Sequence, residues 1–511
     1  MKKLNLLWAE KPLIIIIWLA IIFRLVAVIF AKGFGMHDDH FLVIEVSQSW
    51  VDGVNFNHWL PGSDTNAQPS GHSFFYTGLT YLILNFFHLL QINDPQTKMF
   101  IIRFIHAVFS MITVYYGYKI TEKIATKESA KLVGLLLAIG WIMPWLSVRN
   151  LVEVVCIPFL MLGIWFIVNS EQKKNIMLAY LLSGIFFGLA FSVRFQTLFF
   201  TAGVGIALLL LKRWKAAIYF LIGLISSICI IQCSTDYYFW GYPFAELGEY
   251  VRYNMENAYN YLTASWYTYI LLLLGILIPP ISFFLFFGFF RTWKKQLLIF
   301  LPTLLFLVFH SYFPNKQERF IIPIFPFIIM LGVIGWNNFI EKSKFWLKRT
   351  KLLRGCWVFF WIINCILLIF ISTMYSKRSR VESMVYLSKY KNIHNILIED
   401  SNHGRAKRPP QFYLGQWVKV KEYAKSEEYS PLSKVYAGAS KNDYPDFILF
   451  FGDKNLTTRM DSIKKIAPHI EYEATIRPGL VDVILFKMNP INSNQTIYIY
   501  RNTDLFPFKL Q

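Results

Sequence analysis

Long uninterrupted apolar segments recur along the first three quarters of this chain. Between residues 12 and 374 many of them reach about 20 residues, the length that an α-helix needs to cross a bilayer core of about 30 Å. A helix in a soluble protein would instead carry polar residues at helical spacing on its solvent side. The pattern therefore predicts a polytopic α-helical membrane protein. The first segment, 12–31, follows three lysines and lacks a clean cleavage site, which is typical of a signal anchor.

The basic residues between the apolar segments predict the topology. They form five clusters, at 119–131, 173–174, 212–215, 291–295 and 342–354, and the connections between the clusters hold few basic residues. Lysine and arginine are enriched in cytoplasmic loops, so we expect the N-terminus in the cytoplasm and, after eleven crossings, the C-terminus outside. The expected spans are 12–31, 98–118, 132–148, 151–169, 176–193, 196–211, 216–233, 266–290, 297–312, 319–340 and 355–374.

One further apolar segment, residues 73–91, is also hydrophobic enough to cross the membrane. If it crossed, every basic cluster after it would lie on the wrong face. We therefore expect a re-entrant or interfacial helix inside one long external loop, residues 32–97. A compensating span missed elsewhere is the alternative.

The composition changes after residue 375. Three short apolar stretches, 393–399, 446–451 and 481–486, predict buried strands, and the polar stretches between them suit helices. We expect a transmembrane domain over residues 1–375 and a small extracytoplasmic α/β domain over residues 376–511. The second region has no glycine-rich phosphate loop and no cluster of metal ligands in its sequence.

Composition and charge exclude several other classes of protein. The chain of 511 residues is 55% hydrophobic and only 16% charged, whereas an ordinary soluble domain is about 25% charged. The net charge of +20 reflects many basic residues in short loops, so we interpret it as topological bias and expect no nucleic-acid partner. The five cysteines lie in or beside apolar segments, which argues against a disulfide framework or a cysteine zinc site.

Two adjacent carboxylates open the first external loop, in the sequence HDDH at 37–40, and Glu45 follows them. Two carboxylates just beyond a membrane span cost free energy unless water solvates them or they take part in the function of the protein. A solvated turn or a helix cap is the structural alternative to a functional role. A metal site made of His37, Asp38, Asp39 and His40 would need a special turn, because adjacent residues cannot all converge on one ion. We expect no metal site and no cofactor, although the sequence does not exclude a divalent ion.

A second group of charges, NKQERF at 315–320, lies in the short outer loop before the tenth expected span. Lys316 and Arg319 oppose the charge bias of an outer loop. They are either snorkelling anchors or partners of a lipid phosphate, for which arginine offers a bidentate contact and lysine a point charge. Other charges on this face also stand at helix ends: Arg149 with Glu153, and Arg194 beside Gln196. Such a collection of ionisable residues predicts a functional site.

These segments resemble the family 22 glycosyltransferases, the lipid-linked mannosyltransferases of N-glycan and GPI-anchor assembly. HDDHFLVIEVSQSW at 37–50 is similar to the Pro-Asp-Glu motif of the family's first lumenal loop, and HSYFPNKQERFIIPIFP at 310–326 is similar to its His-Lys-Glu-Glu-Arg-Phe motif. The segment from Arg149 to Glu153 looks like a shortened form of a third motif. The resemblance covers residues 12–340. His37, Asp39, Asn315 and Gln317 depart from the family pattern, which suggests a divergent, bacterial branch.

The resemblance implies the GT-C fold and transfer of a hexose, with mannose expected, from a polyprenyl-phosphate donor to a glycolipid or glycan acceptor. An attacking hydroxyl needs a carboxylate to accept its proton, and a departing phosphate needs cations in a partly dry site. We expect inversion on the non-cytoplasmic face, with Asp38 as the general base and Asp39 as second choice or acceptor-orienting partner. Lys316 and Arg319 would hold the donor phosphate, and Glu318 would orient Arg319. Further candidates for acceptor or substrate binding are His37, Glu45, Arg149, Glu153 and Arg194.

Other classes of membrane protein compete with this interpretation. A secondary transporter would have a similar number of spans but also repeat symmetry, and the sequence shows no repeat. An oligosaccharide polymerase or ligase would lack the base in the first loop. A phosphoethanolamine-type transferase would need a metal cluster in a larger outer domain. For the glycosyltransferase we expect a bacterial inner (plasma) membrane rather than the endoplasmic reticulum.

Overall fold

The apolar segments form helices in the computed structural model, which describes residues 2–56, 58–60, 68–170, 176–260, 262–402, 406–424, 432–436, 438–440, 443–489 and 494–507. The chain divides into two compact units. The first comprises Met1–Ile29, Ser49–Phe86 and Phe100–Thr373, and the second comprises Phe30–Gln48, Phe87–Met99 and Met374–Gln511. The second unit therefore contains the residues that follow the first apolar segment as well as the C-terminal part of the chain.

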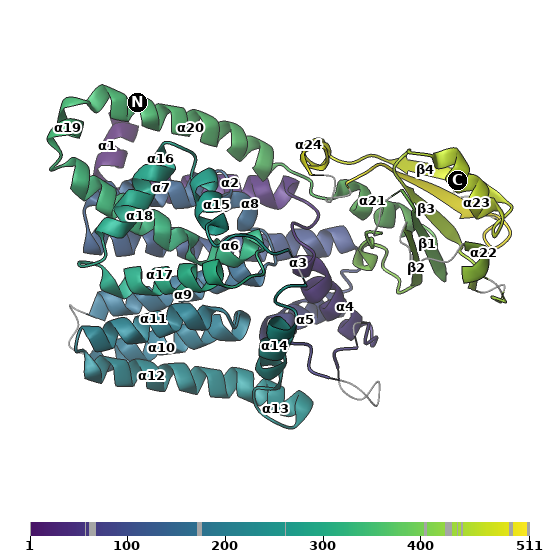
Figure 1. The fold of residues 1–511 in the computed structure, drawn as a ribbon, viewed down its shortest axis with the longest axis horizontal. Coiled ribbons are helices and arrows are strands. Elements are labelled where there is room, and N and C mark those ends of the chain that lie inside the picture. Colours follow the sequence, from purple (N-terminus) through teal and green to yellow (C-terminus); the bar gives the residue numbers. More distant parts are fainter. Residues whose placement is uncertain are drawn as a thin grey trace. The chain divides into compact units, whose positions relative to one another are not determined.

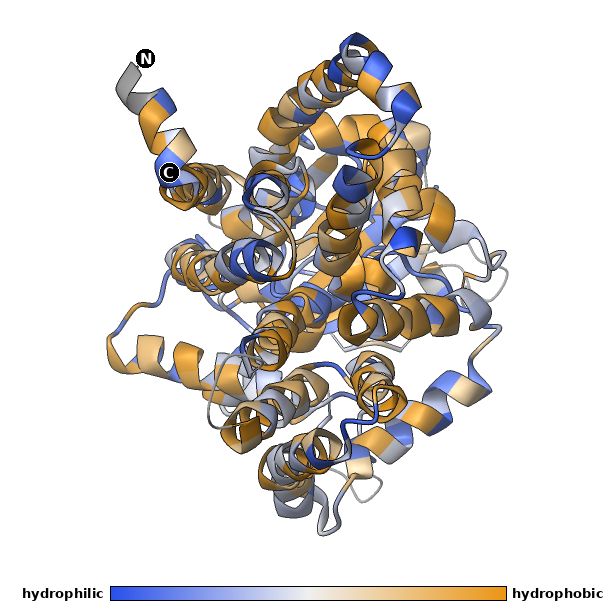
Figure 2. Ribbon diagram, turned by 90° about the vertical axis from the view of Figure 1, so that its left-hand side faces the viewer, coloured by the Kyte–Doolittle hydropathy of each residue, from blue (hydrophilic) through white to orange (hydrophobic). Residues whose placement is uncertain are grey.

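The first unit is a bundle of apolar helices (Figure 1) whose hydrophilic residues gather toward helix ends and connections (Figure 2). Among the described residues, seven helices are long and apolar enough to cross a membrane. They are α2 (Pro12–Phe30), α6 (Pro95–Ile124), α9 (Val152–Ser170), α10 (Ile176–Val193), the continuous α12–η2–α13 (Trp214–Trp240), η3–α18 (Glu318–Ile340) and α20 (Thr350–Ser372). Each matches one of the expected spans.

The other four expected spans are short or bent. Residues 132–148 are divided between α7 (Lys127–Ile139) and α8 (Met143–Leu146). Residues 266–290 form α15 (Thr268–Ile276) and α16 (Ile281–Arg291), and the chain bends by 120° between these two helices. Pro279 and Pro280 stand at that break, where a proline cannot donate the helical hydrogen bond. The other two are α11 (Thr197–Leu210) and α17 (Leu297–Tyr312). The described helices thus give seven spans, or up to eight with the bent pair, and the count of eleven is not confirmed.

The segment expected to be re-entrant or interfacial forms α5 (Phe74–Leu89), a helix of 16 residues. Its length of about 24 Å is less than the bilayer core of about 30 Å, and its interfacial position stays a prediction. In the same unit α14 (Ala245–Glu256) runs across the direction of the bundle helices (Figure 1). The remaining helices before residue 373 are α1 (Lys2–Glu10), α3 (Asp38–His40), η1 (Phe41–Glu45), α4 (Val46–Val51), α14 (Ala245–Glu256) and α19 (Lys344–Lys348).

Glycines allow the bundle helices to touch through their backbones. A Cβ added to Gly184 of α10 would overlap the carbonyl oxygen of Phe220 in α12, and one added to Gly223 of α12 would overlap that of Leu181 in α10. Gly203 of α11 lies equally close to Pro302 of α17. Such small-residue contacts are the usual basis of helix packing in a bilayer, where lipid competes with every apolar side chain.

In the second unit the described residues form a five-stranded sheet with the order β2-β1-β3-β5-β4. The strands β1 and β2 are parallel, as are β1 and β3, whereas β5 is antiparallel to both β3 and β4. The central strands β1 (Asn395–Asp400) and β3 (Phe447–Phe451) are buried throughout and match two of the expected strands. The other elements are β2 (Lys419–Ala424), β4 (Ile470–Ile476), β5 (Ile497–Asn502), α21 (Arg378–Leu387), η4 (Gln411–Tyr413), α22 (Leu432–Val435) and α23 (Leu456–Lys464).

The prediction of a third strand at residues 481–486 was wrong. This segment lies in a helix, α24 (Leu480–Met488), in which Asp482 is buried and accepts hydrogen bonds from the N–H groups of Lys377 and Arg378. A short apolar run fits a strand and a helix equally well by periodicity. The helix places Asp482 against the backbone of Lys377 and Arg378, about 100 residues earlier in the chain. A local sequence pattern contains no information about such distant contacts.

Gly223→Leu should prevent the close approach of α10 and α12. The new side chain would meet the backbone of Leu181 and Ile185, which cannot yield as a flexible side chain can, so we expect a loss of about 3 kcal/mol or more. Thermal unfolding of the detergent-purified protein measures this change. Gly355→Leu is the control, because a Cβ at Gly355 in α20 meets nothing within 4 Å. Equal stability of the two variants would contradict the described packing.

Candidate active site

Charged side chains from three distant segments meet in the first unit. Glu153 lies in the first turn of α9 and is fully buried. Its Oε1 is 3.1 Å from Nη2 of Arg194, which follows α10, and 3.6 Å from Nε of Arg319 in η3. The arginine side chains are only 10% and 8% exposed. One carboxylate therefore serves two buried guanidinium groups, and the cluster retains a net positive charge.

Two glutamines orient the arginines. Nε of Arg194 donates to Oε1 of Gln196 at 3.1 Å, and Nε of Arg319 donates to Oε1 of Gln317 at 2.9 Å. Both guanidinium groups also lie beside the ring of Phe320, 5.2 and 5.3 Å from its centre. The planar groups are thereby fixed in direction, as bidentate recognition of an oxyanion requires.

Lys316 lies in the same loop as Arg319. Its N–H donates to the carbonyl oxygen of Leu262 at 2.9 Å, beside an isolated antiparallel bridge between Thr263 and Asn315. Its Nζ donates to the carbonyl oxygen of Phe313 and lies 5.7 Å from the centre of the Tyr269 ring. Burial lowers the pKa of Lys316 below the ordinary lysine value. The ammonium group is thus partly desolvated in the absence of substrate.

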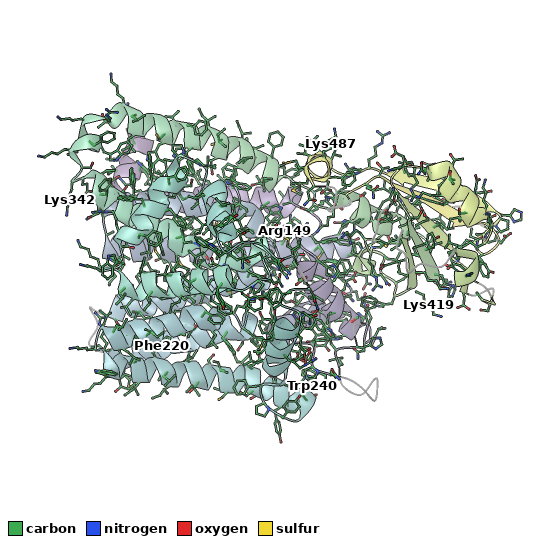
Figure 3. The ribbon with its side chains drawn as sticks, viewed as in Figure 1. Arg149, Phe220, Trp240, Lys342, Lys419 and Lys487 are labelled. Carbon is green, nitrogen blue, oxygen red and sulfur yellow. The ribbon has the colours of Figure 1, made fainter. Side chains whose placement is uncertain are left out.

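The remaining candidates of the first unit take other positions. Glu318, which was expected to orient Arg319, has an exposed side chain. The guanidinium group of Arg319 contacts Glu153 and Gln317. Arg149 is buried and stacks on Trp145 at 4.5 Å. Figure 3 places Arg149 toward one end of the bundle and Lys342, in a basic cluster, toward the other.

His310 was missed by the sequence reasoning although it lies at the start of the segment 310–326. Its ring stacks on Phe306 at 4.1 Å and lies 6.2 Å from that of Phe320. Nδ1 is 2.8 Å from the carbonyl oxygen of Phe306, so Nδ1 carries the proton. Nε2 is buried and has no hydrogen-bond partner among the described residues.

A separate polar network surrounds Glu246 at the start of α14. This buried carboxylate accepts hydrogen bonds from Oγ of Ser70 at 2.9 Å, the N–H of His72 at 3.2 Å and Nε1 of Trp240 at 2.8 Å. Burial raises the pKa of Glu246 to about 7. The network joins Ser70 and His72 to α13 and α14.

The first-loop carboxylates belong to the second unit. Asp39 is 3% exposed, and its two oxygens accept hydrogen bonds from the N–H groups of Gly35 at 2.9 Å and Met36 at 3.2 Å. Asp38 begins α3 and is half-buried. His37 is exposed, with its ring stacked on Phe41 at 4.4 Å. Asp39 thus stabilises its own turn, whereas Asp38 has the more accessible carboxylate.

Glu45 anchors this loop segment to η4. It is fully buried, and its Oε1 accepts a hydrogen bond from the N–H of Phe412 at 3.0 Å and lies 3.6 Å from Nε2 of His40. The His40 ring in turn stacks on Tyr413 at 5.4 Å. Burial lowers the pKa of Arg380 to about 10, and the negative charge of Glu45 opposes that shift.

Backbone contacts fix the residues that precede Asp38. Gly33 pairs with Ser376 in an isolated parallel bridge and has φ +73°. A Cβ at this position would overlap the carbonyl oxygen of Ser376, so both the conformation and the space require glycine. Lys377 then donates from Nζ to the carbonyl oxygen of Gly35 at 2.8 Å.

The described residues contain no group of three or more His, Cys, Asp or Glu side chains that could hold a metal ion. The five cysteines, all within those residues, are free thiols.

A multi-pass helical bundle with buried cations at helix ends, followed by a small α/β domain, has the architecture of a GT-C glycosyltransferase. Solved structures share this fold. ArnT from Cupriavidus metallidurans bound to undecaprenyl phosphate has a TM-score of 0.61 at 11% identity, over 96% of this chain and 98% of that chain. Archaeal AglB from Archaeoglobus fulgidus, in complex with an inhibitory peptide and a dolichol-phosphate, has a TM-score of 0.51 at 10% identity, over 87% and 70%.

The sequence identifies the family. Residues 15–414 match the Alg9-like mannosyltransferase family, and the chain belongs to it. The protein is therefore a membrane-bound glycosyltransferase, and the expected enzyme class and family are confirmed. A comparison with curated protein sequences gives no significant match.

Glu153→Gln should destabilise the first unit. It removes the carboxylate that two buried guanidinium groups share, and breaking a buried ion pair from one side costs about 3–5 kcal/mol. Thermal unfolding in detergent measures the loss. Glu318→Gln is the matched control, since it neutralises an exposed carboxylate beside Arg319 and should leave the unfolding temperature unchanged. Equal effects of both changes would show that Glu153 has no special place in the cluster.

Proposed function

We propose that this glycosyltransferase moves a hexose, with mannose the expected sugar, from a polyprenyl-phosphate donor to a glycolipid or glycan acceptor. The transfer takes place on the non-cytoplasmic face and inverts the anomeric centre. The observation that carries the proposal is the buried cluster of Arg194, Arg319 and Glu153, together with the buried Lys316 in the loop that carries Arg319.

The charge of this cluster suits the departing lipid phosphate. Three cations and one carboxylate leave two net positive charges. A donor phosphodiester carries about one negative charge, and the released polyprenyl phosphate about two. Cations fixed in a site of low dielectric stabilise the state in which that charge has developed more than the ground state. ArnT bound to undecaprenyl phosphate and AglB bound to a dolichol-phosphate support a ligand of this class.

The reaction is a single displacement. The acceptor hydroxyl attacks the anomeric carbon while Asp38 takes its proton, and the bond between that carbon and the phosphate oxygen breaks. The electron pair leaves with the lipid phosphate, which Lys316 and Arg319 receive. Attack opposite to the leaving group inverts the configuration. A carboxylate is needed because a neutral hydroxyl is a poor nucleophile.

The remaining candidates act around these groups. Asp39 keeps the turn that presents Asp38, and Glu45 fixes the same segment through Phe412. Glu153 orients the two arginines. His37 and Arg149 are candidates for binding the acceptor or substrate, and Glu318 is a candidate for the donor-phosphate site beside Arg319.

The arrangement also implies an orientation. We assign the loop of Lys316 and Arg319 to the extracytoplasmic side, with the N-terminus in the cytoplasm and the C-terminal domain outside a bacterial inner membrane. The distribution of basic clusters supports this assignment.

Asp38→Asn should abolish transfer. An amide cannot accept the proton of the attacking hydroxyl, and loss of a general base lowers kcat by about 10²–10⁴-fold. The assay offers the purified protein polyprenyl-phosphate mannose or glucose together with lipid extract from a deletion strain, and follows the product by mass spectrometry. Mannose transfer without added metal and in the presence of a chelator is expected.

Asp52→Asn controls for a charge change elsewhere in the same external loop, because Asp52 is exposed, and should retain activity. Full transfer by a folded Asp38→Asn variant would remove Asp38 as the base. Transfer from a nucleotide sugar instead of the lipid donor would overturn the proposed donor class.

Lys316→Arg should move the fall of kcat/KM at alkaline pH to a higher pH. Lysine holds phosphate only while protonated, and burial lowers its pKa, so activity is lost as pH rises through a value below that of ordinary lysine. Arginine stays charged throughout this range, and the fall in kcat/KM should shift to higher pH. A fall at an unchanged pH would mean that Lys316 is not the titrating group.

A further inference from the structure

An apolar furrow lies between α11 and α12 in the first unit. The helix α11 packs on α17 at Gly203, and α12 packs on α10 at Gly184 and Gly223. Because each helix is drawn closely to a different neighbour, a space of about 430 Å³ stays between them. Its lining is apolar apart from the hydroxyl of Thr201 and the indole N–H of Trp214. It runs from Leu198 near the start of α11 to Trp214 at the start of α12.

A basic pocket of about 860 Å³ adjoins the furrow at the turn between the two helices. Lys212, Arg213 and Lys215 line it, and none of the eight described residues that form its wall is acidic. Nη1 of Arg213 donates to the hydroxyl of Tyr180 at 3.3 Å. Trp214 lines both spaces, so the apolar furrow opens directly beside three positive charges.

The furrow faces the hydrocarbon of the bilayer. Trp214, Ile218 and Leu221 belong to a membrane-spanning helix, and each is more than half exposed in the protein alone. An acyl chain is therefore the natural occupant of the furrow. A tryptophan at a helix end beside lysine and arginine is typical of the headgroup level, and basic pockets between transmembrane helices bind anionic headgroups.

This pocket is separate from the candidate active site. Arg194 and Gln196 precede the first residue of α11, whereas Lys212 follows the last. The helix has 14 residues, so the two sites lie about 21 Å apart along its axis. A donor whose phosphate is held by Arg319 cannot at the same time place that phosphate among Lys212, Arg213 and Lys215.

We propose that the furrow and the basic pocket together bind one anionic phospholipid. One acyl chain fills the space between α11 and α12, and the phosphate is held by Lys212, Arg213 and Lys215. A zwitterionic lipid has the same phosphate but would also bring an ammonium group into a pocket that already holds three cations. The site therefore selects phosphatidylglycerol over phosphatidylcholine. The bound acyl chain fills the space that α11 and α12 leave between them.

Native mass spectrometry tests the site on the full-length protein, exchanged into detergent with equal amounts of phosphatidylglycerol and phosphatidylcholine. The wild type should retain phosphatidylglycerol preferentially. Lys212→Gln with Lys215→Gln should weaken its retention by about 30-fold, since each basic residue near a headgroup contributes about 1 kcal/mol. The matched control is Lys294→Gln with Lys295→Gln, an exposed pair beside Trp293 at another turn, which should retain the lipid.

Gly205→Leu tests the furrow independently of charge. Gly205 lines the furrow, and a Cβ there meets nothing within 4 Å, so the leucine should occupy the space of the acyl chain without disturbing the helices. Bound phosphatidylglycerol should fall at least 10-fold, whereas Gly355→Leu should leave it unchanged. The proposal is overturned if the wild type retains the two lipids equally, or if the Lys294 and Lys295 control loses as much lipid as the Lys212 and Lys215 variant. Polyprenyl phosphate bound in the pocket would also overturn it. The wild-type competition decides it even if a variant fails to fold.

Discussion

The candidate active site depends on one buried carboxylate. Arg194 and Arg319 come from segments more than 120 residues apart, and at low dielectric their guanidinium groups would repel each other strongly. Glu153 holds both through Oε1 and lies in the first turn of α9, where the helix dipole favours a negative charge. It therefore joins the ends of α9, α10 and η3, and it leaves a net positive charge for an anionic substrate.

A second constraint acts on the proposed base. Asp38 belongs to a short helix that could not hold its position alone. Asp39 closes the turn before it, Glu45 binds the backbone of η4, and Gly33 pairs with Ser376. The residues after 374 thus supply partners to the first-loop segment. The described residues of the C-terminal α/β region therefore hold the segment that carries Asp38.

The sequence predicted the parts of this structure that local patterns control. Long apolar runs identified seven spanning helices, and cations that oppose the charge bias of their loop singled out Lys316 and Arg319. Spans divided by a turn, such as α15–α16 at Pro279 and Pro280, were joined because the apolar pattern continues through the break. His310 was overlooked because an imidazole at a helix end resembles an ordinary surface residue until its partners are known, and Gln317 was noted only as a departure from the family pattern. The pairing of Glu153 with Arg319 depends on packing between distant segments, which no single pattern reports.

The most direct test of the central claim is a structure of the protein with a polyprenyl-phosphate sugar bound. The account predicts phosphate oxygens within hydrogen-bonding distance of Arg319 and Lys316, and the anomeric carbon next to the Asp38 carboxylate. A phosphate bound at any other place, such as the turn of Lys212 and Lys215, with the Arg194–Glu153–Arg319 cluster unoccupied, would contradict it.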